Sequence, residues 1–329
     1  MSQTMRRVGT SSLAVFLVIL SYSTGVRGGP TIKVVGDRFY HPKSPEDYLQ
    51  TYVILPKDHT SITPPIAVGV EATHGFVDKA SQLPLTSIII PIGPSRFFNL
   101  TSVDVPKTSI PAVGSNPFTF VYWSYHLFGH VPVGIYDKAH FDFHFMIPSA
   151  DYWWNQQWTP NTHGPCLGGS NETFFKTFKP IPDKCWPGGA SSVIKQIGDF
   201  VWGMGSHLFD YGAPEFNPNQ YFNFTHIYGL YDGEIQYFEA MITQETMQQP
   251  RGYRECRPLK NPEAMAVSRD IPGMLCVERK TKVFAIEYNL FSSVPGGCGA
   301  LTSKTAMGGY PASATPVPPL CSVPPPVTA

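Results

Sequence analysis

The sequence has little charge, and the charge it has is balanced. Its 24 basic and 24 acidic residues give a formal net charge of zero, and charged residues make up only 15% of the 329 residues. Proteins that bind nucleic acid or anionic membranes carry a basic excess or a basic patch. We therefore expect no nucleic-acid partner and no electrostatic attachment to a membrane surface.

The sequence also lacks a long apolar run. The run Leu13–Leu20 has eight residues, whereas a membrane-spanning helix needs about 20. Two arginines precede this run, and small residues follow it up to Gly28. This pattern is typical of a cleavable secretory signal. We predict a signal peptide over residues 1–28 and a secreted, extracellular protein without a membrane span.

Common catalytic motifs are missing as well. The chain has no Gly-x-Ser-x-Gly elbow, no P-loop and no Gly-x-Gly-x-x-Gly, and none of its six cysteines forms a Cys-x-x-Cys pair. An even number of cysteines in a secreted chain predicts disulfides rather than zinc ligands. The cysteines are Cys166, Cys185, Cys256, Cys276, Cys298 and Cys321. We expect no free thiol, and the sequential pairing (166–185, 256–276, 298–321) has the shortest loops.

The composition predicts a mainly β protein. The 33 prolines and 29 glycines interrupt the chain too often for long helices, and the apolar runs are short and β-branched. We expect a β-rich single domain, sandwich- or barrel-like, with few short helices. The expected strands cover residues 66–73, 87–92, 118–123, 140–145, 222–229, 234–243 and 282–291, with a hairpin turn at Asp232-Gly233.

The chain divides into segments by its composition. The β-rich domain is expected over residues 30–250, with a disulfide-stapled insertion at about 160–190. A cysteine-bearing extension follows over 251–305, and a Pro-rich tail over 306–329. Three Asn-x-Ser/Thr sequons, at Asn99, Asn171 and Asn223, predict glycosylation if the host glycosylates its secreted proteins.

The segment from His140 to Phe145 alternates strictly between polar and aromatic residues. Successive side chains of a strand point to opposite faces. One face would therefore carry Phe141, Phe143 and Phe145, and the other His140, Asp142 and His144. Three phenyl rings predict a core face. Two imidazoles and a carboxylate in one row indicate a functional site, either for metal binding or for catalysis.

This segment belongs to a longer pattern, Gly129-His130-x-Pro132-x-Gly134-x-Tyr136-Asp137-x-x-His140-Phe-Asp-Phe-His-Phe145. The pattern resembles the signature of the TTHB-type family of secreted or lipid-anchored proteins of unknown function. Two further blocks agree in order, Met204-Gly-x-His207-x-x-Asp210 and Phe224-Thr-His226 leading to Phe238-Glu239. The resemblance covers roughly residues 60–250, and departs from the family at Ala240 and around Cys166 and Cys185. It implies a compact β-rich domain with a polar cluster and no established activity.

The polar row could bind a metal. Same-face neighbours on a strand lie about 6.5–7 Å apart, so His140 and His144 are too far apart on a flat strand to share one ion. The predicted metal ligands are His140, Asp142, His144, His207 and Glu239, with His130, Asp210 and His226 in the second shell or a nearby loop. Imidazole and carboxylate donors suit Zn, Fe, Mn or Cu.

Two other interpretations stay open. The row could be a buried hydrogen-bond network that stiffens the sheet without metal, or a metal-free catalytic site. In the first case the protein would be a non-catalytic extracellular domain that binds an unknown small ligand or forms homo-oligomers. The sequence does not decide whether the protein is an enzyme.

Overall fold

The computed structural model describes residues 29–83, 107–109, 114–130, 132, 134–148, 179, 181–201, 205–218 and 220–298. Several predictions lie outside these residues. They are the signal peptide, the strand at 87–92, most of the insertion, the Pro-rich tail, the sequons at Asn99 and Asn171, and the two cysteines Cys166 and Cys321.

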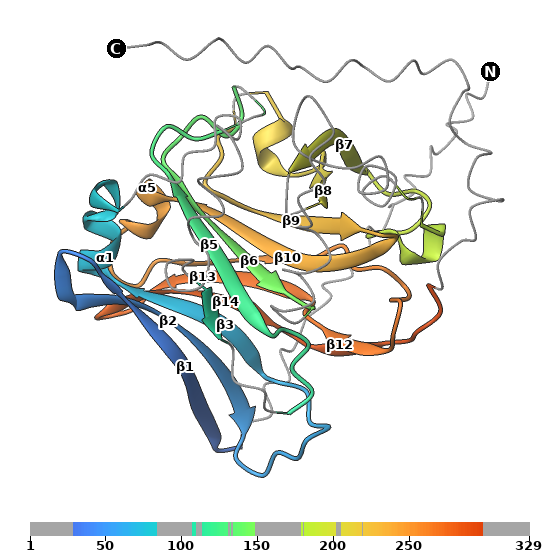
Figure 1. Cartoon of the computed structure of the whole chain (residues 1–329), viewed down its shortest axis with the longest axis horizontal. Helices are drawn as coiled ribbons and strands as arrows, with labels where there is room; N and C mark the ends of the chain where they lie inside the picture. Colours follow the sequence, from blue (N-terminus) through green and yellow to red (C-terminus); the bar gives the residue numbers. More distant parts are fainter. Residues whose placement is uncertain are drawn as a thin grey trace, which may run out of the picture.

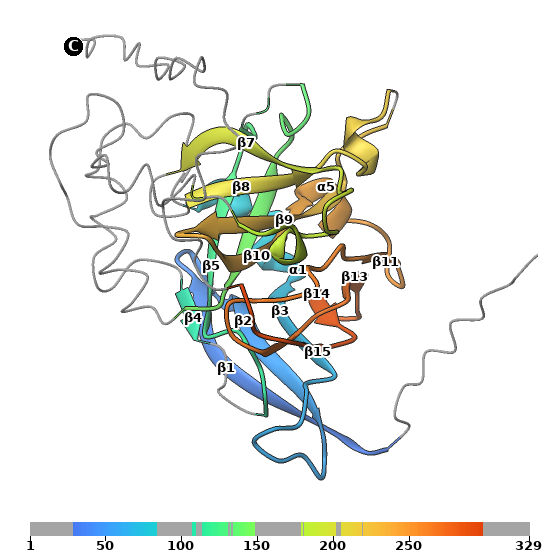
Figure 2. The ribbon, with the colours of Figure 1, turned by 90° about the vertical axis from the view of Figure 1, so that its right-hand side faces the viewer.

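Two large antiparallel sheets form the fold. The first has six strands in the order β1 (Thr31–His41), β2 (Ser44–Pro56), β3 (Ala67–Thr73), β14 (Val283–Asn289), β13 (Met274–Arg279) and β11 (Arg254–Pro258). The second has seven strands in the order β4 (Lys107–Ser109), β5 (Phe120–His126), β6 (His140–Met146), β10 (Glu234–Thr243), β9 (Phe224–Tyr231), β8 (Gly205–Asp210) and β7 (Ile194–Val201). A short pair, β12 (Arg269–Ile271) and β15 (Ser292–Val294), completes the strands described. Figures 1 and 2 show the two large sheets facing each other.

Helices are short and begin where strands end. The helix α1 (His74–Asp78) follows β3, and α5 (Gln244–Met247) follows β10. In each case the last residue of the strand is a threonine whose hydroxyl accepts a hydrogen bond from a backbone N–H of the first turn, which is a typical N-cap. Three 3₁₀ turns are also present, η1 (Ala80–Gln82), η2 (Asp183–Cys185) and η3 (Pro214–Phe216). The predicted mainly β fold with few short helices is confirmed. Among the residues described, no helix has the length and apolar content to cross a membrane.

Strand β6 lies in the middle of the seven-stranded sheet, between β5 and β10. Phe141, Phe143 and Phe145 are fully buried in the core between the two large sheets. The ring of Phe145, for example, packs edge-on against Tyr288 of β14, with ring centroids 4.8 Å apart. The core face predicted from the alternation is therefore confirmed.

The six-stranded sheet is built from the two ends of the described chain. Strands β1 and β2 precede the region of the family resemblance, and β11, β13 and β14 follow it. Because β14 pairs with both β3 and β13, the segment after residue 250 is a central part of this sheet. In Figure 1 the blue strands and the orange strands of this sheet lie side by side.

The sequential disulfide pairing is wrong for Cys185 and Cys298, which bond to each other. The backbone N–H groups of Glu263 and Ala264 both donate to the carbonyl of Lys184, so the η2 turn packs beside the C-terminal segment. This contact brings together two cysteines 113 residues apart. The shortest-loop argument fails here because tertiary packing, rather than separation along the sequence, determines which cysteine lies next to Cys185.

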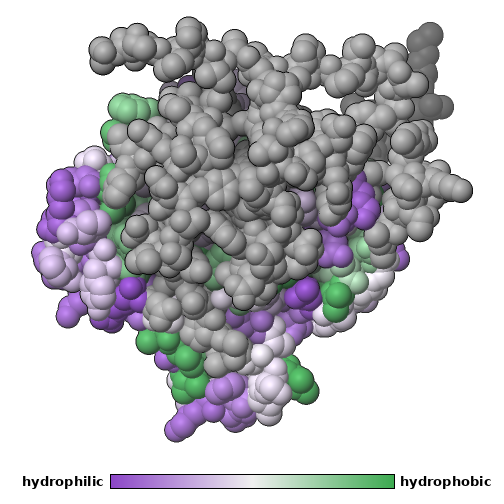
Figure 3. Space-filling model, in the orientation of Figure 1, coloured by the Kyte–Doolittle hydropathy of each residue, from purple (hydrophilic) through white to green (hydrophobic). Residues whose placement is uncertain are grey.

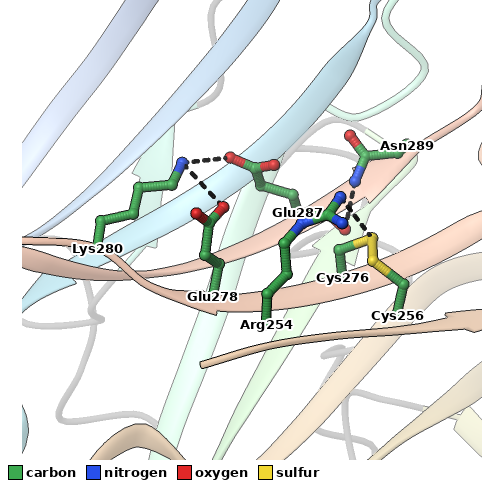
Figure 4. Close-up of a disulfide and its surroundings, with 7 residues drawn as sticks. All are labelled: Arg254, Cys256, Cys276, Glu278, Lys280, Glu287 and Asn289. Atoms are coloured by element: carbon green, nitrogen blue, oxygen red, sulfur yellow. Dashed lines mark hydrogen bonds and ion pairs between the residues drawn. A yellow bond between two sulfur atoms is a disulfide. The ribbon is translucent and has the colours of Figure 1, made fainter. Parts of the chain in front are cut away.

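The pairing of Cys256 with Cys276 is confirmed. These two residues lie directly opposite each other on β11 and β13. Figure 4 shows this disulfide beside Arg254 and the ion pairs that Lys280 makes with Glu278 and Glu287. None of the four cysteines in the described residues is free. Asn223 is exposed just before β9, and its glycosylation stays a prediction.

Shortening a side chain on the core face of β6 should lower the stability of the protein. Phe143 is fully buried, and replacing a buried Phe by Ala typically lowers the free energy of unfolding by about 3–5 kcal/mol. The matched control is Phe128→Ala, because Phe128 is 66% exposed and its loss should change the stability by less than about 0.5 kcal/mol. Equilibrium denaturation of the two variants measures the difference. Equal effects would contradict the placement of β6.

Candidate metal centre

The polar face of β6 continues onto its neighbours. On β5, Tyr122, Ser124 and His126 lie opposite His144, Asp142 and His140 of β6. On β10, Glu239 lies opposite His144. Directly opposed residues share a face of the sheet. The polar residues therefore form one patch on the face of the seven-stranded sheet that points away from the core.

A second, smaller apolar cluster lies against this patch. It consists of Tyr136, Phe209, Phe222, Ile227 and Met241. The ring of Phe222 packs edge-on against His140, with centroids 5.2 Å apart. The polar row is as buried as the core, with His140, Asp142 and His144 all at most 3% exposed.

The first set of metal-competent side chains is His144, His207 and Glu239, called here the Glu239 group. Their ligand atoms all lie within 4.8 Å of one another. Glu239 Oε1 is 3.3 Å from His144 Nε2, and Glu239 Oε2 is 3.6 Å from His207 Nε2. One carboxylate thus lies between two imidazoles that come from β6 and β8.

A glycine allows Tyr237 to reach His207. His207 lies opposite Gly229 on β9, and Gly229 lies opposite Tyr237 on β10. A methyl group on Gly229 would overlap the Tyr237 ring. The missing side chain lets Tyr237 lie across β9, and its hydroxyl is 3.0 Å from His207 Nε2.

Both histidines of the Glu239 group are neutral. Burial lowers the pKa of His144 to about 4 and that of His207 to about 3. A neutral imidazole keeps a lone pair, which is the form that binds metal. Within the described residues, His144 Nε2 and His207 Nδ1 are buried and have no hydrogen-bond partner.

The second set is the Asp142 group, which consists of Asp142 with His126, His130 and His140. His126 Nε2 and His130 Nε2 lie 2.9 and 3.2 Å from Asp142 Oδ2, and His140 Nε2 lies 3.1 Å from Asp142 Oδ1. Of these, His126, His130 and Asp142 satisfy the same mutual 4.8 Å spacing as the first set. Burial opposes ionisation of Asp142, but the three surrounding imidazoles hold its pKa well below the usual range. Burial also lowers the pKa of His126.

The structure divides the predicted site residues between the two groups. His140 and His144 join different groups, as the strand spacing requires, and His207 joins His144 and Glu239 but not Asp142. Asp210 lies apart and pairs with Lys260 at 2.7 Å. His226 also lies apart, because it shares the core face with Ala240 and contacts the Tyr288 hydroxyl at 2.8 Å.

His126 is a site residue that the sequence analysis missed. The predicted strand ended at residue 123, whereas β5 continues to His126. Extending the alternation Tyr122, Ser124, His126 would have found this residue. The signal was present but weak, because residues 124–126 lack the β-branched pattern of a strand.

No family model, curated protein or solved structure matches this chain. The resemblance to the TTHB-type family therefore stays a prediction, and the function must be argued from the two groups themselves.

Buried neutral histidines should make the fold sensitive to mild acid. Burial lowers the pKa of His226 to about 3, whereas an unfolded histidine titrates near 6.5. Between pH 7 and 5 the unfolded chain therefore gains a proton that the folded chain does not. This difference lowers the free energy of unfolding by up to about 2 kcal/mol per histidine. Stability is retained above pH 6.5 and is lost as the pH falls towards 3.

His226→Gln tests this dependence, because glutamine keeps a polar partner for Tyr288 but does not titrate. Denaturation at pH 7 and pH 5 in the presence of a chelator should show a smaller loss of stability in the variant than in the wild type. An unchanged loss would show that His226 does not stay neutral in the folded state.

Proposed function

We propose that this protein is a secreted, extracellular protein that binds a divalent metal ion at the Glu239 group. One observation carries the proposal. Two neutral imidazoles flank one buried carboxylate within the reach of a single ion, and His144 Nε2, 3.3 Å from Glu239 Oε1, has no hydrogen-bond partner in the described residues. Buried polar groups in native proteins are nearly always satisfied, so an unsatisfied imidazole nitrogen that faces a carboxylate favours a bound cation.

The types of ligand in the Glu239 group limit which metal ions it can bind. Two imidazole nitrogens and one carboxylate suit Zn, Fe, Mn or Cu rather than the oxygen-rich sites of calcium or magnesium. Three protein ligands leave a position for a water molecule or a small ligand, as in catalytic zinc sites. Tyr237 is placed to position such a ligand, because its hydroxyl already contacts His207.

The extracellular location has independent support. The two disulfides in the described residues indicate an oxidising environment, since such bonds are rare in the reducing cytosol. Together with the signal sequence predicted at residues 1–28, they favour secretion.

A second function is favoured by the hydrogen bonds of the Asp142 group. The hydroxyl of Ser124 lies 2.9 Å from His126 Nε2, and His140 Nδ1 lies 2.6 Å from the carbonyl oxygen of Lys138. These bonds could hold the imidazoles without an ion. The protein would then be a non-catalytic extracellular domain that binds a ligand or forms oligomers, with the polar network stiffening its sheet.

Metal analysis separates the two functions. The full-length secreted chain, purified without a chelator or a metal-affinity column, should contain at least one transition-metal ion per chain by mass spectrometry. His207→Ala removes a ligand and should lose the ion of the Glu239 group. His226→Gln, which replaces a partly buried histidine outside both groups, should keep the wild-type metal content.

If the polar residues form a metal-free network, the metal content and the stability of the variants should differ from this expectation. Wild type and both variants would hold no ion even after incubation with Zn²⁺. His207→Ala would instead lower the free energy of unfolding by about 1–3 kcal/mol, because it leaves buried partners unsatisfied.

A further inference from the structure

Three imidazoles converge on Asp142 from different parts of the chain. His126 ends β5, His140 begins β6, and His130 lies in the loop between these strands. The ring centroids are 4.8 Å apart for His126 and His130, 5.3 Å for His126 and His140, and 4.7 Å for His130 and His140. Each ring directs its Nε2 atom to the same carboxylate, at 2.9 to 3.2 Å.

The proton on His140 can be placed. Its Nδ1 lies 2.6 Å from the carbonyl oxygen of Lys138, and a carbonyl only accepts, so Nδ1 donates. A singly protonated ring then carries its lone pair on Nε2, which faces Asp142 Oδ1 at 3.1 Å. Neither of these two buried atoms has a hydrogen-bond partner in the described residues. Two acceptors that face each other in this way need a cation or a second proton between them.

We propose that His126, His130, His140 and Asp142 bind a second divalent metal ion, an inference that builds on the proposed function of the Glu239 group. A backbone carbonyl that accepts from the far nitrogen of an imidazole is the usual support of a metal-binding histidine. His126, His130 and Asp142 already have the mutual spacing of metal ligands, and a small approach of His140 Nε2 from the Oδ1 side would complete a four-coordinate zinc or copper site.

The two ions would be neighbours but would not share ligands. Asp142 and His144 are successive residues on one face of β6, about 6.5–7 Å apart. Two-metal catalytic sites with bridging ligands hold their ions about 3.5–4 Å apart. Each site should therefore keep its ion when the other is destroyed.

The two sites also differ in their access to solvent. The His130 side chain is 18% exposed, whereas those of His144 and Glu239 are 1% and 3% exposed. The loop that carries His130 turns at Gly129, whose φ of +71° suits glycine. The ion at the Asp142 group should therefore exchange faster than the ion at the Glu239 group.

Zinc reconstitution tests this inference. The full-length chain is stripped with a chelator, incubated with Zn²⁺ alone, dialysed and measured for zinc content and for the rate of zinc release into excess EDTA. We expect two ions in the wild type, released in a fast and a slow phase. His130→Ala should hold one ion and lack the fast phase, and His207→Ala should hold one ion and lack the slow phase.

Other outcomes overturn the inference in distinguishable ways. If the wild type and His130→Ala each hold one ion and His207→Ala holds none, the Asp142 group is a protonated network and only the Glu239 site survives. If His130→Ala still holds two ions, His130 is not a ligand. A wild type that binds no zinc would overturn the proposed function as well. Near-UV circular dichroism checks folding, and His130→Asn, which keeps a polar side chain in the loop, provides a second variant with the same expectation.

Discussion

Burial of two carboxylates on one face of a β-sheet is the constraint on which this structure depends. Asp142 and Glu239 are 3% and 2% exposed, and a buried charge without a partner costs several kcal/mol. Each carboxylate is surrounded by imidazoles, but His144 and His207 stay neutral at physiological pH and so carry no positive charge that could balance a carboxylate beside them. A divalent cation would supply that balance and would use the lone pairs that the neutral rings offer.

The fold provides the rigidity that such a site needs. The same strand that carries Asp142 and His144 sends three phenyl rings into the core between the sheets, so a shift of β6 by one residue would place its polar row in the apolar core and its rings among the polar side chains. This register is therefore fixed by the hydrophobic core between the two large sheets. The strands that supply the other imidazoles, β5 and β8, are held in the same sheet.

The sequence predicted those features that depend on local patterns. Alternation identified both faces of β6, and the Asp-Gly dipeptide identified the turn at Asp232-Gly233, where both residues have positive φ values in the structure. Features that depend on distant neighbours were not predictable in this way. The bond of Cys185 to Cys298 follows from the packing of the η2 turn beside the C-terminal segment, and the division of the polar residues into two groups follows from which strands lie side by side. His207 and Glu239 entered the predicted site only through the family resemblance.

The central claim is that the outer face of β6 holds metal, and anomalous X-ray scattering from crystals of the metal-loaded protein tests it most directly. Data collected on both sides of the absorption edge of the bound metal should show an anomalous peak within about 2–2.2 Å of the nitrogens of His144 and His207 and of a Glu239 oxygen. A water molecule or a direct hydrogen bond in that position, with no anomalous signal at either group, would contradict the account.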